Sequence, residues 1–185
     1  MSTKTGIHGR ETIASGKYLT LQKVSFTNGR GLTGVWECVN RTNAAGAAVI
    51  IPRLMPGDDL ILIRQFRPPA GRYMIEFPAG LIEEGETPES TALRELYEET
   101  GYTGKIEKVI PPSYNSPGMS GETVSMVIMT VDKNEYPQIP ENHQEASEDI
   151  QTLIVSRADL PAFVEKAIAD GDGIDARIAV FAAML

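Results

Sequence analysis

The chain has 185 residues, a net charge of −8, 42% hydrophobic residues and 23% charged residues. This length suits one domain, or one domain with a modest appendage, and the composition is typical of a globular rather than a disordered chain. The negative charge disfavours binding to nucleic acid or to anionic lipid. A single cysteine, Cys38, excludes an internal disulfide framework and a zinc cluster built on thiolates.

Three features bear on the compartment. The lone cysteine suits a reducing environment. No apolar run approaches the ~20 residues that a membrane-spanning helix needs. The first residues are polar and lack the apolar segment of a signal peptide. We therefore expect a cytoplasmic protein that binds neither membranes nor nucleic acid.

The N-terminal quarter of the chain predicts a β-hairpin. Residues 17–26 alternate loosely between apolar and polar side chains, and residues 34–40 form a second run of the same kind. The Asn28-Gly29 pair between them is a strong turn signal. We place residues 1–45 in this N-terminal β-hairpin region and residues 46–185 in the main domain.

The main domain predicts strands followed by a few helices, which indicates the α+β class. Pro52 is expected to end its first strand, because proline cannot donate to a β ladder. The predicted strands are 47–51, 60–66, 73–77, 105–110, 123–131 and 149–155, and the later predicted helices are 160–169 and 174–185. Residues 134–147 form a long acidic loop, and loops of that length are often functional.

One further helix has clear ends. Thr87 suits the N-cap, Pro88 suits the first helical position, and Gly101 suits a left-handed C-cap. At about 100° per residue, one side of this helix carries Ala92, Leu93, Leu96 and Tyr97, which we expect to face a core, and the other carries Arg94, Glu95, Glu98 and Glu99.

Acidity is concentrated around this helix. Between Gly80 and Tyr102 there are seven carboxylates and one basic residue, so this segment carries six of the eight net negative charges. Charged helix faces are commonly just solvated. Here, however, Glu95 repels both Glu98 and Glu99, at about 0.2–0.5 kcal/mol for each like-charge pair. A divalent cation would turn this repulsion into a ligand set, because hard cations prefer carboxylate oxygens.

The full string, GLIEEGETPESTALRELYEETGY, resembles the signature of the Nudix hydrolases. Every fixed position of that signature is met, and Tyr102 stands where an aliphatic residue is usual. The resemblance implies an α/β/α sandwich with a mixed sheet. It also implies binding of Mg²⁺ or Mn²⁺ and hydrolysis of a nucleoside diphosphate linked to another moiety.

Other stretches resemble the ADP-sugar (ADP-ribose) pyrophosphatases of this superfamily. Pro117 lies sixteen residues after Gly101, similar to a proline that marks ADP-ribose hydrolases. The matching stretches are GKYLTLQ (16–22), VWECVNRT (35–42), IRQFRPPAG (63–71), IEFPAGLIEEGE (75–86) and SPGMS (116–120).

The resemblance implies a metal site and a general base. Glu95, Glu99 and the carbonyl of Ala79 would coordinate the metal. Glu98 is either a third ligand or the ion-pair partner of Arg94, and both alternatives stay open. Glu86 and Arg94 would orient the ligating carboxylates. Glu148 falls at the place of the catalytic base, with Glu145 and Glu141 in the same loop as competitors.

The resemblance also implies substrate contacts. Arg41 and Arg67 are candidate phosphate clamps, since the guanidinium fork suits a diphosphate. Trp36 would lie against the adenine ring, with Glu37 accepting a hydrogen bond from the exocyclic amine. The remaining implied contacts are Tyr18, which would come from the partner subunit of a homodimer, the backbone of Leu81, and Ser116, which stands where relatives carry an aspartate that contacts the ribose.

The function that follows is divalent-metal-dependent hydrolysis of ADP-ribose to AMP and ribose 5-phosphate. Three alternatives remain. One is a pyrophosphatase for another nucleotide sugar, such as GDP-mannose or ADP-glucose. Another is a protein that binds ADP-ribose without turning it over. The third is mRNA decapping or nucleotide-pool cleaning, of which the acidic surface disfavours the activity on long RNA.

Overall fold

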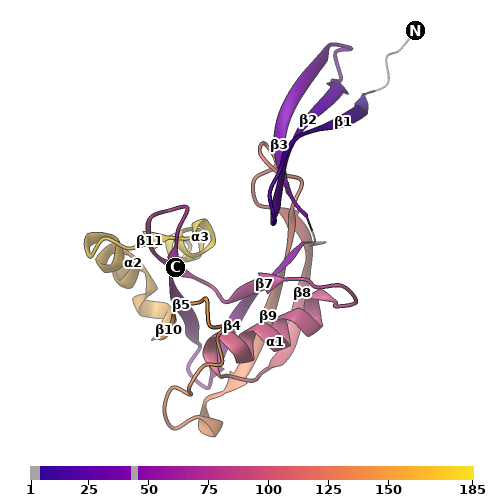
Figure 1. The fold of residues 1–185 in the computed structure, drawn as a ribbon. Helices are drawn as coiled ribbons and strands as arrows, with labels where there is room; N and C mark the ends of the chain where they lie inside the picture. The colour runs from indigo at the N-terminus through magenta and orange to yellow at the C-terminus, as the bar shows by residue number, and fades with distance from the viewer. Residues whose placement is uncertain (1–4, 43–45) are drawn as a thin grey trace.

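The computed structural model describes residues 5–42 and 46–185, which form two separate sheets (Figure 1). The first, called here the N-terminal sheet, is antiparallel and contains β1 (Gly6–Ser15), β2 (Leu19–Thr27) and β3 (Thr33–Arg41). The turn between β2 and β3 is closed by Asn28, whose side-chain oxygen accepts hydrogen bonds from the N–H groups of Arg30 and Leu32. The predicted hairpin is therefore confirmed.

The strand β1 was missed by the sequence analysis, which assigned residues 1–16 to no element. It pairs antiparallel with β2, and all ten of its residues are exposed. Because neither face of β1 is buried, its sequence carries no clear alternation of apolar and polar residues. The strand is formed by main-chain hydrogen bonds to β2, and such bonds do not require a particular pattern of side chains.

The second sheet is mixed and forms the body of the molecule. Its strands run in the order β11-β6-β5-β4-β9-β8, with β10 paired to β5 and β7 paired to β4. The β4–β9 and β6–β11 pairs are parallel and the others are antiparallel. Its strands are β4 (Ala47–Met55), β5 (Asp59–Arg67), β6 (Arg72–Glu76), β7 (Ala79–Leu81), β8 (Lys105–Tyr114), β9 (Thr123–Asp132), β10 (Ile150–Val155) and β11 (Gly173–Ile174).

Pro52 does not end β4, and the prediction of a strand over 47–51 was too short. On one side β4 pairs with β9 along its whole length. On the other side β7 pairs with residues 47–49 and β5 pairs with Arg53 and Leu54. Pro52 falls between these two ladders, where the missing N–H interrupts no pairing, and a proline is tolerated at such a position.

Helices cover both faces of the body sheet. On one face α1 (Pro88–Thr100) contributes Ala92 and Leu96 to a core with strand residues such as Ile61. On the other face α2 (Leu160–Ala169) and α3 (Ala176–Ala183) pack on a second core. Two short 3₁₀ helices, η1 (Lys133–Glu135) and η2 (Arg157–Asp159), complete the elements. The α+β class and the α/β/α sandwich are confirmed.

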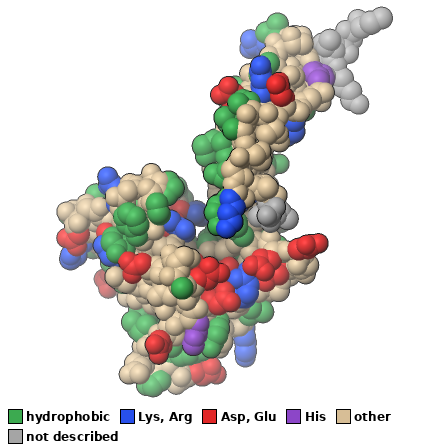
Figure 2. All heavy atoms as spheres, in the orientation of Figure 1, with side chains coloured by type: hydrophobic (Ala, Val, Ile, Leu, Met, Phe, Trp, Pro, Cys, Tyr) green, Lys and Arg blue, Asp and Glu red, His purple; other side chains and the backbone are tan. Residues whose placement is uncertain are grey.

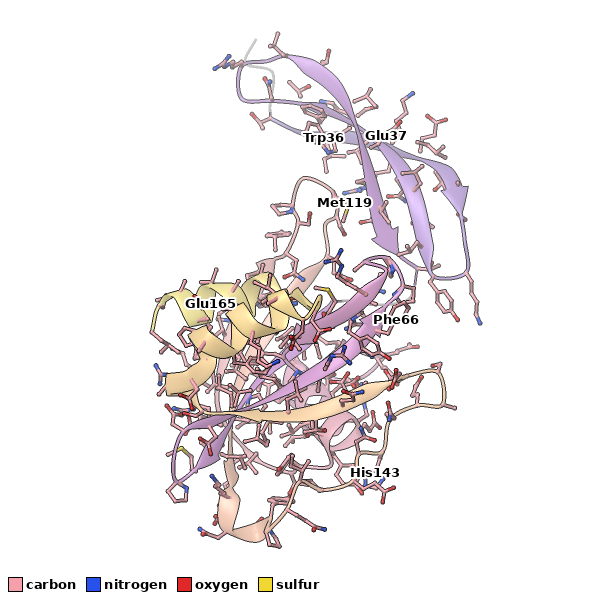
Figure 3. The ribbon with its side chains drawn as sticks, turned by 90° about the vertical axis from the view of Figure 1, so that its left-hand side faces the viewer. Trp36, Glu37, Phe66, Met119, His143 and Glu165 are labelled. Atoms are coloured by element: carbon pink, nitrogen blue, oxygen red, sulfur yellow. The ribbon has the colours of Figure 1, made fainter. Side chains whose placement is uncertain are left out.

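The N-terminal sheet projects from the body (Figures 1 and 3). It touches the loop before β9, where Val39 donates a backbone hydrogen bond to the Met119 carbonyl at 2.9 Å and the Trp36 indole N–H donates to the Gly118 carbonyl at 2.8 Å. A domain boundary at residue 45 remains a proposal. None of the described helices is long and apolar enough to span a membrane.

Candidate active site

The helix α1 begins and ends as its sequence predicts. The Thr87 side chain accepts a hydrogen bond from the Ser90 N–H, and the Ser90 hydroxyl accepts one from the Thr87 N–H, so the two residues form a capping box. Gly101 closes the helix with a φ of 74°, a left-handed conformation that glycine adopts without strain. These caps determine which carboxylates fall on each turn of the helix.

The face that α1 buries differs from the prediction. Leu93 and Tyr97, expected in the core, are 45% and 43% exposed, whereas Glu99, expected on the polar side, is only 3% exposed. The stripe in contact with the sheet is narrower than the apolar side of the helix. It includes Glu99 because β7 supplies a hydrogen-bond donor for that carboxylate.

Glu99 lies between α1 and the strand β7. The Ala79 N–H donates to its Oε2 at 2.9 Å. Burial raises the pKa of Glu99 well above its ordinary value of 4.5, and the nearby charges of Glu95 and Glu148 raise it further. In the absence of a cation, this carboxyl is therefore driven toward its protonated form.

Glu95 packs directly on the backbone of Gly80. A Cβ atom at residue 80 would lie 1.7 Å from the Glu95 Oε1, so only glycine leaves room for this side chain. Burial raises the pKa of Glu95, while the Arg94 guanidinium acts in the opposite direction. Glycine at position 80 thus brings the Glu95 carboxylate against the segment that contains Ala79.

Arg94 joins the acidic groups together. Its guanidinium donates to Glu86, to Glu95 at 2.7 Å and to Glu98 at 3.0 Å. The hydrogen bonds from Arg94, with others from the Thr91 hydroxyl and the Glu83 N–H, lower the pKa of Glu86 to about 2. Glu98 is therefore an ion-pair partner of Arg94 in this structure, which is one of the two alternatives that the sequence left open.

A cleft of about 410 Å³ opens beside these groups. Figure 2 shows acidic side chains gathered on the body close to the N-terminal sheet, with a basic side chain among them. Of the predicted site residues, the cleft is lined by Arg41, Arg67, Ala79, Leu81, Arg94, Glu95, Glu98, Glu145 and Glu148. The structure thus brings predicted site residues from five separate segments into one cavity.

The loop before β10 contributes two of the three candidate bases. The Glu145 N–H donates to the Glu148 Oε2, and the Glu148 N–H donates to the Glu145 carbonyl, both at 3.0 Å. Glu141 does not line the cleft, and its backbone instead packs against Gly101 at the end of α1. The structure therefore brings Glu148 and Glu145, but not Glu141, to the cavity.

Besides Arg94, three further arginines line the cleft, each paired with an acidic residue. Arg41 pairs with Glu122, Arg67 with Glu76 at 2.7 Å, and Arg177 with Asp175 at 2.6 Å. The sequence analysis missed Arg177, and also Asn115 and Glu122, which line the same cavity. Arg177 lies 110 positions after Arg67 in an ordinary helical pattern, so the sequence offered no signal for it.

The predicted adenine contacts lie outside this cleft. Trp36 is 54% exposed and Tyr18 is 67% exposed, and Figure 3 shows Trp36 and Glu37 on the N-terminal sheet, away from the body. Trp36 lines a different hollow of about 630 Å³, together with Phe26 and Tyr114. Ser116 begins the turn whose residues Pro117 and Gly118 line this hollow, and its carbonyl accepts from the N–H groups of Met119 and Ser120. One chain does not bring these residues to the carboxylates.

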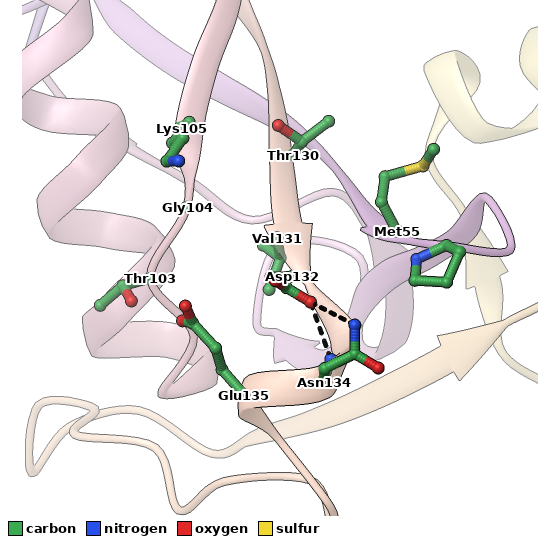
Figure 4. A pocket seen from close by; sticks show the side chains of 10 residues that line it. Met55, Thr103, Gly104, Lys105, Thr130, Val131, Asp132, Asn134 and Glu135 are labelled. Atoms are coloured by element: carbon green, nitrogen blue, oxygen red, sulfur yellow. Dashed lines mark hydrogen bonds between the residues drawn. The ribbon is translucent and has the colours of Figure 1, made fainter.

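Another hollow, of about 470 Å³, lies at the far ends of β4 and β9 (Figure 4). Its lining includes Met55, Lys105, Asp132 and Glu135, and Asp132 accepts two hydrogen bonds from Asn134. The cleft with the carboxylates lies at the opposite ends of these strands, beside Ala47 and Val124. The hollow in Figure 4 contains no predicted site residue.

Among the described residues, no three acidic, histidine or cysteine side chains converge as a preformed metal site. Of the carboxylates on α1, those of Glu95 and Glu98 form ion pairs with Arg94. The donors are nevertheless the hard oxygens that magnesium prefers. Two of them, on Glu95 and Glu99, have pKa values raised by burial, which a bound cation would reverse.

Comparison with known proteins gives consistent matches. Residues 44–172 match the family model described as the NUDIX domain. An ADP-sugar pyrophosphatase of Mus musculus is 41% identical over 132 residues, which cover 68% of this chain and 61% of the mouse protein. The match thus spans less than two thirds of that relative.

Two other matches cover more of both chains. An ADP-ribose pyrophosphatase of Saccharomyces cerevisiae is 34% identical over 184 residues, 92% of this chain and 78% of the yeast protein. A crystal structure described as an ADP compounds hydrolase has a TM-score of 0.67 and 27% identity, over 89% of this chain and 85% of the other.

Proposed function

The chain belongs to the NUDIX domain family, and on that basis we propose that it is a divalent-metal-dependent hydrolase that cleaves ADP-ribose to AMP and ribose 5-phosphate. The observation that carries this proposal is the cleft in which the carboxylates Glu95 and Glu98 lie with four arginines. A diphosphate is repelled by carboxylates and attracted by guanidinium groups. A site with both kinds of group suits a diphosphate that binds together with a cation.

Glu95, Glu99 and the carbonyl of Ala79 would hold the cation. Support comes from the contact of Glu95 with Gly80 and from the hydrogen bond between Glu99 and the Ala79 N–H, which bring these groups together. To bind a cation, Glu95 would exchange its contact with Arg94. When bound, a metal such as Mg²⁺ or Mn²⁺ neutralises phosphate charge and lowers the pKa of a coordinated water.

Glu148 would take the proton from the attacking water. It lines the cleft, and it is close enough to Glu95 and Glu99 for its charge to affect the pKa of both. Glu145, in the same turn, is the competitor. If Glu148 is the base, Glu148→Gln should lower kcat by about 10²–10⁴-fold. Glu145→Gln should then have a much smaller effect, and a reversed order would assign the base to Glu145.

The arginines would bind the diphosphate, and the N-terminal sheet would bind the adenosine. Arg41 and Arg67 would clamp the phosphates, with the backbone of Leu81 nearby. Trp36 and Glu37 would contact the adenine, Tyr18 of a second copy would complete the sandwich, and Ser116 would lie near the ribose.

A homodimer follows from this assignment. Neither Trp36 nor Tyr18 lines the cleft of its own chain, and a second copy that brings its Tyr18 to the adenine would complete the site. We also propose the cytoplasm as the compartment, because Cys38 is a free thiol.

Hydrolysis of ADP-ribose in H₂¹⁸O with Mg²⁺, followed by mass spectrometry, tests the activity. We expect AMP and ribose 5-phosphate as products, with ¹⁸O on one of them to identify the attacked phosphorus. A parallel panel with ADP-glucose and GDP-mannose tests the alternative substrates. ADP-ribose binding without any turnover would favour the non-catalytic alternative and overturn the proposal.

A further inference from the structure

The loop that precedes β10 is fastened to α1 by an aromatic stack. The ring of Tyr97 and the imidazole of His143 lie with their centroids 4.4 Å apart and their planes at 21°. The His143 backbone N–H donates to the Glu98 carbonyl at 2.7 Å. This carbonyl belongs to the last turn of α1, which has no partner within the helix, so the loop also caps the helix.

The stacked residue His143 is close in sequence to the candidate bases. Glu145 and Glu148 follow His143 by two and five residues, and both line the cleft. The two neighbours of His143 bond to the first residue of β10. The Asn142 side chain donates to the Ile150 carbonyl at 3.0 Å, and the Gln144 side chain accepts from the Ile150 N–H at 2.7 Å. The segment is therefore held at β10 by two amide side chains and at α1 by the stack. Glu145 and Glu148 therefore lie between the residues that hold this segment, 142–144, and the start of β10 at Ile150.

Packing of the core does not account for Tyr97. Its ring is on the exposed side of α1, 43% accessible, and it belongs to neither buried core. Leu93, one turn earlier on the same side, is exposed to the same degree, at 45%. Tyr97 differs from Leu93 in its contact with the loop, and this makes Leu93 a matched control.

We propose that Tyr97 and His143 are positioning residues that set the place of Glu145 and Glu148 relative to Glu95 and Glu99. This inference rests on the proposed function, in which one loop carboxylate accepts a proton in a site built on α1. The stack couples the two elements directly, because Tyr97 lies between Glu95 and Glu99 in sequence and His143 lies on the base-bearing loop. Catalysis is sensitive to ångström-scale displacement of a reacting group, so loosening this contact should slow the reaction.

The first test is kinetic. In Tyr97→Ala and His143→Ala we expect kcat for ADP-ribose to fall about tenfold, with KM changed less than about twofold, because neither side chain lines the substrate cleft. Tyr97→Phe and His143→Phe keep a ring at each position and should retain the kcat of the unchanged protein. The double variant Tyr97→Ala/His143→Ala should be no slower than the slower single variant, as expected for two groups that act as one unit.

The second test does not depend on activity. Hydrogen exchange at the His143 amide should be about tenfold faster in Tyr97→Ala than in the unchanged protein, and unaffected in Leu93→Ala and Tyr97→Phe. Thermal unfolding of each variant checks that the fold is intact. If Tyr97→Ala fails to fold, Tyr97→Leu, which keeps the bulk but removes the stack, replaces it in both tests.

The two proposals fail in different ways. If the unchanged protein does not hydrolyse ADP-ribose, the proposed function fails, and the exchange measurement still decides whether the stack holds the loop. If the unchanged protein is active and Tyr97→Ala and His143→Ala keep its kcat, the positioning role is wrong. An equal loss of kcat in Leu93→Ala would overturn it as well.

Discussion

The helix α1 and the N-terminal sheet distribute their side chains in opposite ways. In α1 a carboxylate, Glu99, is 3% exposed, while the apolar Leu93 is 45% exposed. In the N-terminal sheet all ten residues of β1 are exposed, and Trp36 is 54% exposed. Within the described part of the three strands, only Val24 and Thr27 are buried.

These two regions therefore depend on different partners. The cleft beside α1 is assembled from one chain, and the carboxylate of Glu99, buried next to Ala79, is one whose ionised form a cation would favour. The N-terminal sheet leaves large apolar side chains open to solvent, which costs hydrophobic stabilisation unless another surface covers them. Under the proposed function a metal ion completes the first region and a second copy of the chain completes the other.

The largest expected effect is at α1. Glu99→Gln keeps the shape of the side chain but removes its charge, and it should lower kcat for ADP-ribose on the order of 10³-fold, because a metal ligand contributes several kcal/mol to transition-state stabilisation. Steady-state rates with Mg²⁺ measure the loss of kcat, and calorimetric titration with Mg²⁺ measures the accompanying loss of metal affinity.

Glu84→Gln is the matched control for this substitution. Glu84 is an exposed carboxylate of the same segment and does not line the cleft, so its replacement should leave the rate unchanged. Retention of more than about a tenth of the activity in Glu99→Gln would contradict the metal-binding role.

The next largest effect is expected at the N-terminal sheet. Trp36→Ala should raise KM for ADP-ribose about tenfold with little change in kcat, because stacking of a base on an aromatic ring contributes about 1–3 kcal/mol. Val35→Ala, at the adjacent exposed position that points to the other face of β3, should change KM much less. Sedimentation velocity on both variants shows whether the dimer persists. An unchanged KM in Trp36→Ala would remove the N-terminal sheet from the adenine site.

A smaller effect is expected at Arg177, the cleft residue that joins from α3. Arg177→Gln should raise KM for ADP-ribose about fivefold, and Arg177→Lys should recover only part of this, since lysine lacks the bidentate fork. Arg157→Gln, which removes an arginine outside the cleft, should not change KM. Equal KM values for Arg177→Gln and the unchanged protein would confine the phosphate contacts to Arg41 and Arg67.

The smallest effect concerns the pH dependence of stability in the metal-free protein. The pKa of Glu99 is raised above 4.5 in the folded state. As pH rises above 4.5 the unfolded chain ionises first, so Glu99 should lower stability with increasing pH. Mg²⁺ favours the ionised form and should raise Tm more at pH 8 than at pH 5, by a few degrees.

Glu86 acts in a different pH window and with the opposite sign. Its pKa is lowered from 4.5 to about 2 in the folded state, so its contribution is complete above 4.5 and is lost as pH falls toward 2. Tm measured from pH 3 to pH 8 separates the two groups. Glu99→Gln should flatten the profile above pH 4.5 without affecting the acid side, and an unchanged slope above 4.5 would show that Glu99 is not its source.

Much of the site was predictable because its signals are local. The caps at Thr87 and Gly101 determine where α1 begins and ends, and the spacing of the glutamates then places Glu95 and Glu98 on one side of it. The same reasoning failed for Leu93 and Tyr97, because helical periodicity shows which residues share a side of the helix but not how wide a stripe the sheet covers. Sequence reasoning missed β1 because a strand exposed on both faces needs no alternation of apolar and polar residues.

The two ends of α1, the crowding of carboxylates on that helix and the turn between β2 and β3 could all be predicted from the sequence alone. All three depend on residues within a few positions of one another, whose interactions follow directly from spacing. The burial of Glu99 against Ala79, the position of Arg177 in the cleft and the stacking of His143 on Tyr97 depend instead on how the chain folds in three dimensions. Those contacts join segments far apart in the chain, and the physical reason they form is the packing of β7, α3 and the loop before β10 around one sheet.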